Sequence, residues 1–185
     1  EAVKFLANKY GIPIPERQKT AAEIAREQKA KQVIETNELA ARFYQACLTK
    51  TPYGSAALKY LHNRGITDDI IANFSIGFAI NSYDSLLKAL GKRGYSEQML
   101  IQAGLALPGK NNGAYDKFRG RVMIPIKDPR GRTVGFTGRI LGDGMPKYMN
   151  TGETDFFIKR YLLFGFDIAL SEIRKTRQAI VVEGH

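Results

Sequence analysis

The chain has 185 residues, of which 44% are hydrophobic and 25% are charged, so it is an ordinary globular sequence with enough apolar side chains for a core. Its 28 Lys and Arg residues exceed its 18 Asp and Glu residues, and the formal charge of +10 favours a polyanionic partner, either nucleic acid or an anionic membrane surface. A basic but inert surface is the alternative. The single cysteine excludes a disulfide scaffold and a cysteine-built zinc site, and two histidines far apart in sequence argue against a histidine metal site.

Residues 1–19 predict a short helix followed by a stiff linker, because two prolines stand one residue apart in GIPIPE. The segment has no long apolar run, so we expect no signal peptide and an intracellular protein. Thr20 and Glu23 then have the spacing of a capping box, which predicts the start of a helix whose apolar positions continue to Leu48. Cys47 follows this helical pattern and is expected to be a small core residue rather than a nucleophile.

Glycine, proline and hydrophobic spacing divide residues 52–118 into short elements. Gly65 suits the left-handed end of a helix, Thr67 can cap a short turn, and Ser96 can cap the start of a helix. We expect helices at 55–64, 82–94 and 96–104, a short turn at 68–74, a strand at 74–80, and a loop-rich stretch at 105–118.

The clearest β pattern lies at residues 121–141, where two apolar runs flank Asp-Pro-Arg-Gly. Pro129 and Gly131 occupy the second and fourth positions of a type I turn, so we expect a hairpin of strands 121–127 and 132–140. Regular alternation in the first strand would place two sets of side chains on opposite faces: Arg119, Arg121 and Lys127 on one, and Val122, Ile124 and Ile126 on the other.

The C-terminal residues predict an amphipathic helix at 161–175 and a short, buried type of strand at 178–183. The strand ends in the carboxylate of Glu183, which fits a parallel α/β sheet, where ligands gather at the carboxyl ends of strands. Together the elements predict an α+β fold: a small, mostly antiparallel sheet surrounded by helices, followed by the start of a second, α/β subdomain.

Residues 116–160 hold ten cations and five carboxylates, which is half of the net charge of the chain. Single-stranded nucleic acid is bound by cations that follow its phosphates and by rings that stack on its bases. Lys147, Tyr148 and Asn150 supply a cation, a ring and an amide within four residues, and Lys159 follows. The alternative is a loop with a buried tyrosine and two solvated lysines.

Several motifs occur in one order along the chain: YLHNRGI, FSIGFA, YDKFRGRVMIPIKDPRGRTVGFTGRIL, PKYMNTGETDFFIK, and LFGFDIA followed by AIVVEGH. In this order they resemble the RNA-polymerase core of DnaG-type bacterial primases. The opening EAVKFLANKYGIPIPE is similar to the same family, and the helix near 20–50 is the least similar part.

The resemblance implies a layout of three segments. Residues 1–19 would be a linker after an absent zinc-binding domain, 20–160 the basic N-terminal subdomain of the core, and 161–185 the helix and first strand of a truncated TOPRIM subdomain. The implied activity is that of a DNA primase, a DNA-directed RNA polymerase that makes RNA primers for replication. The implied partners are a single-stranded DNA template, NTPs, the RNA primer and, through an absent C-terminal domain, the replicative helicase, in the bacterial cytoplasm and without a membrane.

The resemblance also assigns site residues. Glu183 matches the first TOPRIM carboxylate, and would be a metal ligand and a catalytic residue for Mg²⁺ or Mn²⁺, although one carboxylate cannot hold such a metal alone. Zinc would belong only to the absent N-terminal domain. His185 stands where the family usually has tyrosine, and Arg119 and Arg121 lie in the matching basic motif without an implied contact. The implied contacts with template and nucleotide fall on Arg64, Arg139, Lys147, Tyr148, Asn150 and Lys159.

Other interpretations of these residues stay open. The chain could be a non-catalytic module that binds single-stranded nucleic acid, and Glu183 could be a solvated carboxylate at a strand end. Membrane attachment is disfavoured, because no basic amphipathic helix with large apolar residues is present. For the 185 residues by themselves we expect no primer synthesis, because most of the TOPRIM metal ligands are missing from them.

Overall fold

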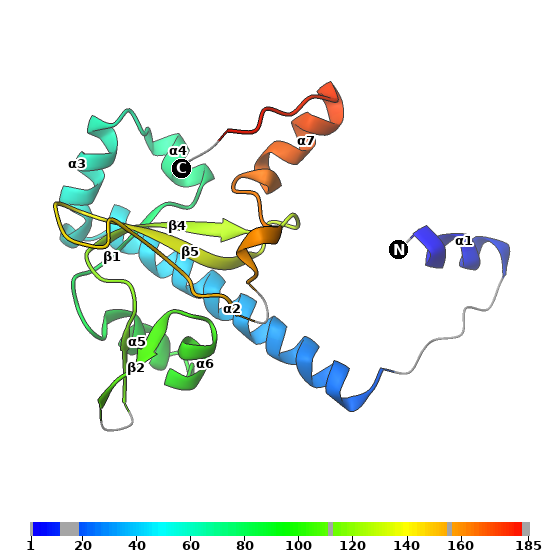
Figure 1. Ribbon diagram of the computed structural model, residues 1–185, viewed down its shortest axis with the longest axis horizontal. Coiled ribbons are helices and arrows are strands. Elements are labelled where there is room, and N and C mark those ends of the chain that lie inside the picture. Colours follow the sequence, from blue (N-terminus) through cyan, green and yellow to red (C-terminus); the bar gives the residue numbers. More distant parts are fainter. Residues whose placement is uncertain (1, 12–18, 111–112, 155–156, 183–185) are drawn as a thin grey trace.

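The chain is built around one long helix, α2 (Ala21–Thr49), in a computed structural model that describes residues 2–11, 19–110, 113–154 and 157–182. The helix begins at the expected capping box. The Thr20 hydroxyl accepts a hydrogen bond from the Glu23 backbone N–H at 3.2 Å, and the Glu23 carboxylate accepts one from the Thr20 N–H at 2.9 Å. The buried residues of α2 begin at Val33, so the N-terminal part of the helix is largely solvent-exposed while the rest packs under a sheet (Figure 1).

A four-stranded antiparallel sheet lies across the C-terminal half of α2 (Figure 1). Its strands stand in the order β1 (Gly77–Ala79), β4 (Arg121–Lys127), β5 (Thr133–Ile140) and β6 (Tyr148–Asn150). The expected hairpin is confirmed as β4 and β5, the two central strands. The strand expected at 74–80 is shorter and confined to β1.

Asp128 fixes the turn of the central hairpin. The backbone N–H of Gly131 donates to the Asp128 carbonyl at 2.8 Å, which closes the expected four-residue turn. The Asp128 carboxylate accepts hydrogen bonds from the backbone N–H groups of Arg130 and Arg132, and the Arg132 guanidinium lies 2.6 Å from it. Burial alone would raise the pKa of Asp128, but these hydrogen bonds outweigh it and lower the pKa.

Alternate residues of the central strands face opposite sides of the sheet. On the side of α2, Met123 and Phe136 are fully buried, and the Phe136 ring meets the Tyr44 ring edge-on with centroids 5.6 Å apart. On the other side, Val122 packs with Leu61 and Ile71 from two short helices. These helices cover only part of that face.

The remaining elements are short and most begin at the residues that the sequence indicated. Thr67 and Ser96 each accept a hydrogen bond from the backbone N–H three residues later, at 3.4 and 3.3 Å, and cap the two helices that follow them. None of the described helices is long and apolar enough to cross a membrane. The elements are α1 (Ala2–Tyr10), η1 (Pro52–Gly54), α3 (Ser55–Asn63), α4 (Asp68–Asn73), α5 (Ser85–Gly91), α6 (Glu97–Gln102), β2 (Ala106–Pro108), β3 (Ala114–Asp116), η3 (Lys159–Tyr161) and α7 (Phe166–Thr176).

The stretch at 105–118, expected to be loop-rich, instead holds a second hairpin, in which β2 and β3 pair antiparallel. Asp116 at the end of β3 is buried and accepts hydrogen bonds from the backbone N–H groups of Leu86 at 2.8 Å and Leu87 at 3.1 Å. It therefore caps the start of α5 from a distant part of the chain. The strands were missed because three residues are too few to show a β alternation.

The C-terminal strand expected at 178–183 is not observed. Helix α7 confirms the helix within 161–175, but 178–182 form no strand, and Ile180, Val181 and Val182 are 93%, 78% and 77% exposed. A strand needs a hydrogen-bonded neighbour, and none of the described strands pairs with this segment. Glu183 and His185 lie outside the described residues.

Candidate nucleic-acid interface

The face of the sheet opposite α2 gathers the polar residues of β5 and β6. Arg139 pairs with Tyr148, and Thr137 pairs with Asn150, so these four side chains share one face in two neighbouring rows. Phe136 points to the other side, into the core under α2. The alternation of β5 therefore places the side chains of Thr137 and Arg139 on the face of the sheet opposite α2.

Arg139 lies against two tyrosine rings. Its guanidinium carbon is 4.9 Å from the centroid of the Tyr60 ring and 5.8 Å from that of the Tyr148 ring, and its Nε donates to the Tyr148 hydroxyl at 3.2 Å. The guanidinium carbon of Arg64 lies 5.1 Å from the centroid of the same Tyr60 ring. Tyr60 therefore joins Arg64, at the end of α3, to Arg139 in β5. Stacking of this kind orients a guanidinium and leaves N–H groups at its edge for an anion.

Tyr60 is a residue that the sequence analysis did not select. It precedes Arg64 by four positions in the expected helix at 55–64, and this spacing places two side chains on one face of a helix. This spacing could have indicated the contact between Tyr60 and Arg64. The second contact, with Arg139, depends on how α3 packs beside the sheet, which the sequence pattern does not show.

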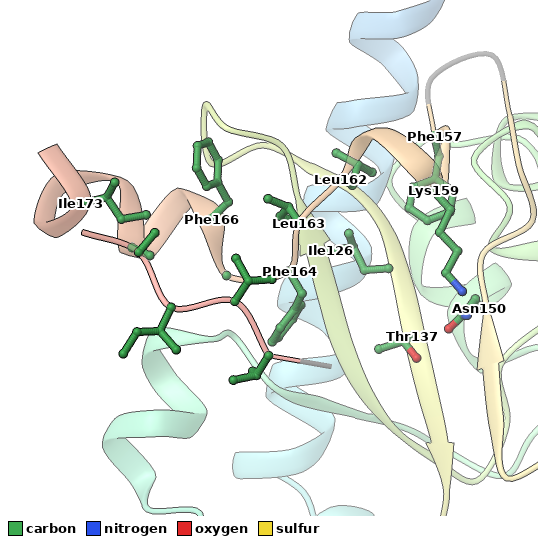
Figure 2. Close-up of a pocket in the computed structure, with 16 residues that line it drawn as sticks. Ile126, Thr137, Asn150, Phe157, Lys159, Leu162, Leu163, Phe164, Phe166 and Ile173 are labelled. Carbon is green, nitrogen blue, oxygen red and sulfur yellow. The ribbon is translucent and has the colours of Figure 1, made fainter. Parts of the chain in front are cut away.

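Asn150 and Lys159 form the second part of the interface. Both line one groove, and Figure 2 shows the Lys159 ammonium directed toward the Asn150 amide, with the Thr137 hydroxyl beside them. Asn150 Oδ1 and Thr137 Oγ1 are buried and have no hydrogen-bond partner among the described residues. Such groups are costly when unpaired, so this corner of the groove is a polar spot with unused hydrogen-bonding capacity.

Beyond this polar spot the groove is apolar. It encloses about 400 Å³ between the sheet and the segment that carries α7, and Ile126, Phe164 and Ile173 contribute to its walls (Figure 2). Exposed apolar side chains continue along 180–182. Hydrogen-bonding side chains are confined to the end with Asn150 and Lys159, so that end is the part suited to a polyanion.

Lys147 and Tyr148 lie where the chain enters β6. Tyr148 is 39% exposed, so the alternative of a buried tyrosine is wrong. Lys147 is exposed, and its carbonyl accepts a hydrogen bond from the Ile140 N–H at 3.0 Å, which holds its backbone at the end of β5. The structure thus brings Arg64, Arg139 and Tyr148 together, places Asn150 and Lys159 next to them, and leaves Lys147 at the margin.

Arg121 does not contribute to this surface. It is 4% exposed, and its Nη1 donates to the carbonyls of Gly138 at 3.1 Å and Pro146 at 2.9 Å. Burial lowers the pKa of Arg121, and the charge of Arg119 lowers it further. The expected basic face of Arg119, Arg121 and Lys127 is therefore not formed, because the Arg121 guanidinium fastens the loop after β5 to the sheet.

Arg119 belongs to a separate cluster. Its guanidinium carbon lies 4.5 Å from the centroid of the Tyr83 ring and 5.4 Å from that of the Tyr115 ring, and it donates to the Asp116 carbonyl. These contacts tie the second hairpin to the loop before α5. Arg119 is thus engaged in holding two segments of the fold together.

The described residues do not form a metal site. Within the parts of the chain that the structure describes, no group of three or more His, Cys, Asp or Glu side chains could hold a metal ion. The expected ligand Glu183 lies outside those parts. Cys47 is buried, and burial raises the pKa of its thiol to about 11, which confirms it as a core residue rather than a nucleophile.

Comparison with known proteins places this chain in one family. The family "DNA primase catalytic core, N-terminal domain" matches residues 43–170. The chain belongs to the DnaG-type family of bacterial DNA primases. The DNA primase of Deinococcus radiodurans is 41% identical over 186 residues, which cover all of this chain and 30% of that protein. The chain thus spans about 30% of the length of such relatives.

Solved DnaG structures share both the fold and the sequence. A DnaG primase catalytic domain bound to single-stranded DNA matches 79% of this chain and 45% of its own chain, with a TM-score of 0.73 and 40% identity. The RNA polymerase domain of Mycobacterium tuberculosis DnaG, in complex with a double-stranded DNA oligomer with a 6-nucleotide overhang, matches 84% of this chain and 49% of its own, with a TM-score of 0.78 and 37% identity. The α+β fold with a small antiparallel sheet is therefore that of part of the DnaG catalytic core.

Proposed function

We propose that this segment holds the single-stranded DNA template in a DNA primase, a DNA-directed RNA polymerase that makes short RNA primers in the bacterial cytoplasm. The observation that carries the proposal is the set of stacked side chains at the face of the sheet opposite α2, which we call the open face. The set consists of Arg64, Tyr60, Arg139 and Tyr148. Cations for phosphates and a partly exposed ring for bases are what single-strand binding requires. The family membership and the DNA-bound DnaG relatives support the same conclusion.

The charge balance of the region also supports DNA binding. Two of the five carboxylates in 116–160 are engaged inside the fold: Asp116 accepts backbone hydrogen bonds at α5, and Asp128 holds the hairpin turn. They are therefore unavailable as counter-charges for the cations of the open face. The proposed binding set comprises the six residues that the family resemblance implies: Arg64, Arg139, Lys147, Tyr148, Asn150 and Lys159.

The chemical step is proposed for the longer polypeptide in which such a segment works in its relatives. We infer that Glu183 supplies one carboxylate to a Mg²⁺ or Mn²⁺ site there, and that the NTPs, the RNA primer and the replicative helicase are partners of that polypeptide. Bound metal would orient the nucleotide phosphates and stabilise charge during transfer. We likewise propose that residues 1–19 are a linker, 20–160 the basic subdomain and 161–185 the start of the TOPRIM subdomain.

Fluorescence titration of the 185-residue chain with a labelled single-stranded oligonucleotide tests template binding. Lys159→Ala should weaken binding and lower the slope of log affinity against log salt by about 0.7, because one phosphate contact is lost. Tyr148→Ala should weaken binding with little change in slope, because the ring carries no charge. Lys147→Ala tests the marginal cation in the same way.

The control for these variants is Lys92→Ala. Lys92 is an exposed cation at the end of α5, which lies on the other side of α2 from the open face (Figure 1). Its removal lowers the net charge by the same amount as the loss of Lys159 but should leave affinity and slope nearly unchanged. Equal effects of Lys92→Ala and Lys159→Ala would refute a localised site and leave only a diffuse basic surface.

A further inference from the structure

The Tyr60 ring is contacted by two cations that come from different elements of the interface. Arg64 reaches it from the end of α3, and Arg139 reaches it from the middle of the sheet, at 5.1 and 4.9 Å from its centroid. The two guanidinium carbons are therefore no more than about 10 Å apart. Two like charges repel at this separation, and the negative face of an aromatic ring offsets part of that repulsion.

The ring is itself held by the fold. Tyr60 packs against the apolar cluster that includes Leu61, Ile71 and Val122, and its hydroxyl is buried without a hydrogen-bond partner among the described residues. A ring anchored in this way has few alternative positions. The two arginines that stack on it are therefore held beside the same ring before any ligand arrives.

The hydroxyl and the ring of Tyr60 differ in their contacts. Because the hydroxyl has no described partner, it contributes no described hydrogen bond to the interface, whereas the ring contacts both guanidiniums. The function of Tyr60 at this place should thus reside in its aromatic face. Substitution of Tyr60 by phenylalanine should preserve this function, whereas substitution by an aliphatic residue should abolish it.

We propose that Tyr60 is a positioning residue that sets Arg64 and Arg139 as a pair for the backbone phosphates of single-stranded DNA. The proposal rests on the proposed template-binding function and adds to it a residue that carries no charge and contacts DNA only through its two arginines. Preorganisation of this kind raises affinity because the ordering of the two long side chains is complete before binding.

The salt dependence of DNA binding distinguishes this role from a merely structural one. Tyr60→Leu should weaken binding of a labelled single-stranded oligonucleotide by about tenfold, the loss expected from two weakened cation–π contacts. It should also lower the salt slope by up to about 1.4, the value for two phosphate contacts, although no charge is removed. Tyr60→Phe should stay within about twofold of the unchanged protein in affinity and keep its slope.

A second pair of variants keeps the test valid if Tyr60→Leu does not fold. Arg64→Lys and Arg139→Lys retain the charge but lose the planar guanidinium that stacks on the ring. Arg64 is exposed at a helix end, so its replacement should leave the fold intact. Each lysine variant should weaken binding several-fold, and unchanged affinity in both would overturn the proposal.

The double variant Arg64→Ala/Arg139→Ala separates this proposal from the proposed function. In that background Tyr60→Leu should have no further effect, because the residues through which it acts are gone. A double variant that binds DNA as the unchanged protein does would refute template binding at this site. Lost binding in the double variant, together with a folded Tyr60→Leu that keeps its affinity and slope, would refute only the role of Tyr60.

Discussion

Each face of the four-stranded sheet carries an arginine, and the two arginines differ in their surroundings. On the face toward α2, the Arg121 guanidinium is buried and bonded to backbone carbonyls of its own sheet. On the other face, Arg139 is partly exposed and stacks on tyrosine rings. Both arginines lie in the basic motifs that the sequence shares with primases, yet only the second is positioned to meet a ligand. Strand alternation, rather than local charge, decides which of these cations lies on the face opposite α2.

The largest expected difference between the faces is in stability. Phe136→Ala should lower the free energy of unfolding by about 3–5 kcal/mol, because a fully buried ring is lost from the core under α2. Thr137→Ala, one residue later and on the open face, removes a hydroxyl with no described partner and should cost far less. Urea unfolding of both variants gives the comparison, and similar losses would show that the open face is as tightly packed as the core.

The two arginines provide the next test. Arg121→Ala should destabilise the protein by about 3 kcal/mol, because hydrogen bonds from a buried charged group are lost and the carbonyls that accept them are left unpaired. DNA affinity measured well below the melting temperature should change little. A folded Arg121→Ala protein with normal stability and weak DNA binding would place Arg121 in the interface after all.

Arg139→Ala should change stability little and should weaken DNA binding. Its stacking contacts are partly exposed, so the unfolding free energy should fall by less than about 1 kcal/mol. The salt slope of binding to a single-stranded oligonucleotide should fall by about 0.7 as one phosphate contact is lost. Thermal melting beside the salt titration measures both, and a large drop in melting temperature with an unchanged slope would reverse the assignment of the two faces.

The smallest expected effect concerns the polar spot beside Asn150. Thr137→Val replaces a buried, unpaired hydroxyl with a methyl group of similar shape, so stability should stay within about 0.5 kcal/mol or rise. DNA affinity should fall only if the hydroxyl bonds to the ligand. A clear destabilisation of this variant would show that Thr137 has a partner within the fold, such as an ordered water.

Local signals in the sequence predicted much of this fold. The capping box at Thr20 and the turn at Asp128 each depend on residues within a few positions, and both formed as expected. The hairpin of β4 and β5 was recognisable because each strand is long enough to show its pattern. The hairpin of β2 and β3 was not, because its strands have three residues each.

The errors at the site have a common cause in long-range packing. Arg121 was grouped with exposed cations because alternation says which residues share a face, but not which face an α-helix covers. The pairing of Tyr60 with Arg139 depends on where α3 meets the sheet. The apolar run at 178–182 was read as a strand on composition, whereas a strand also requires a neighbour to pair with.

The exposed N-terminal part of α2 sets how far from the core the residues before it are attached. The helix rises 1.5 Å per residue, so the stretch from 21 to 32, which precedes its first buried residue, extends about 18 Å from the core. It is a rigid arm anchored at one end (Figure 1). Any module joined to the protein before Thr20 is attached at the far tip of this arm rather than at the sheet. Shortening the helix by whole turns would therefore move the point at which the residues before Thr20 are attached in steps of about 5.4 Å.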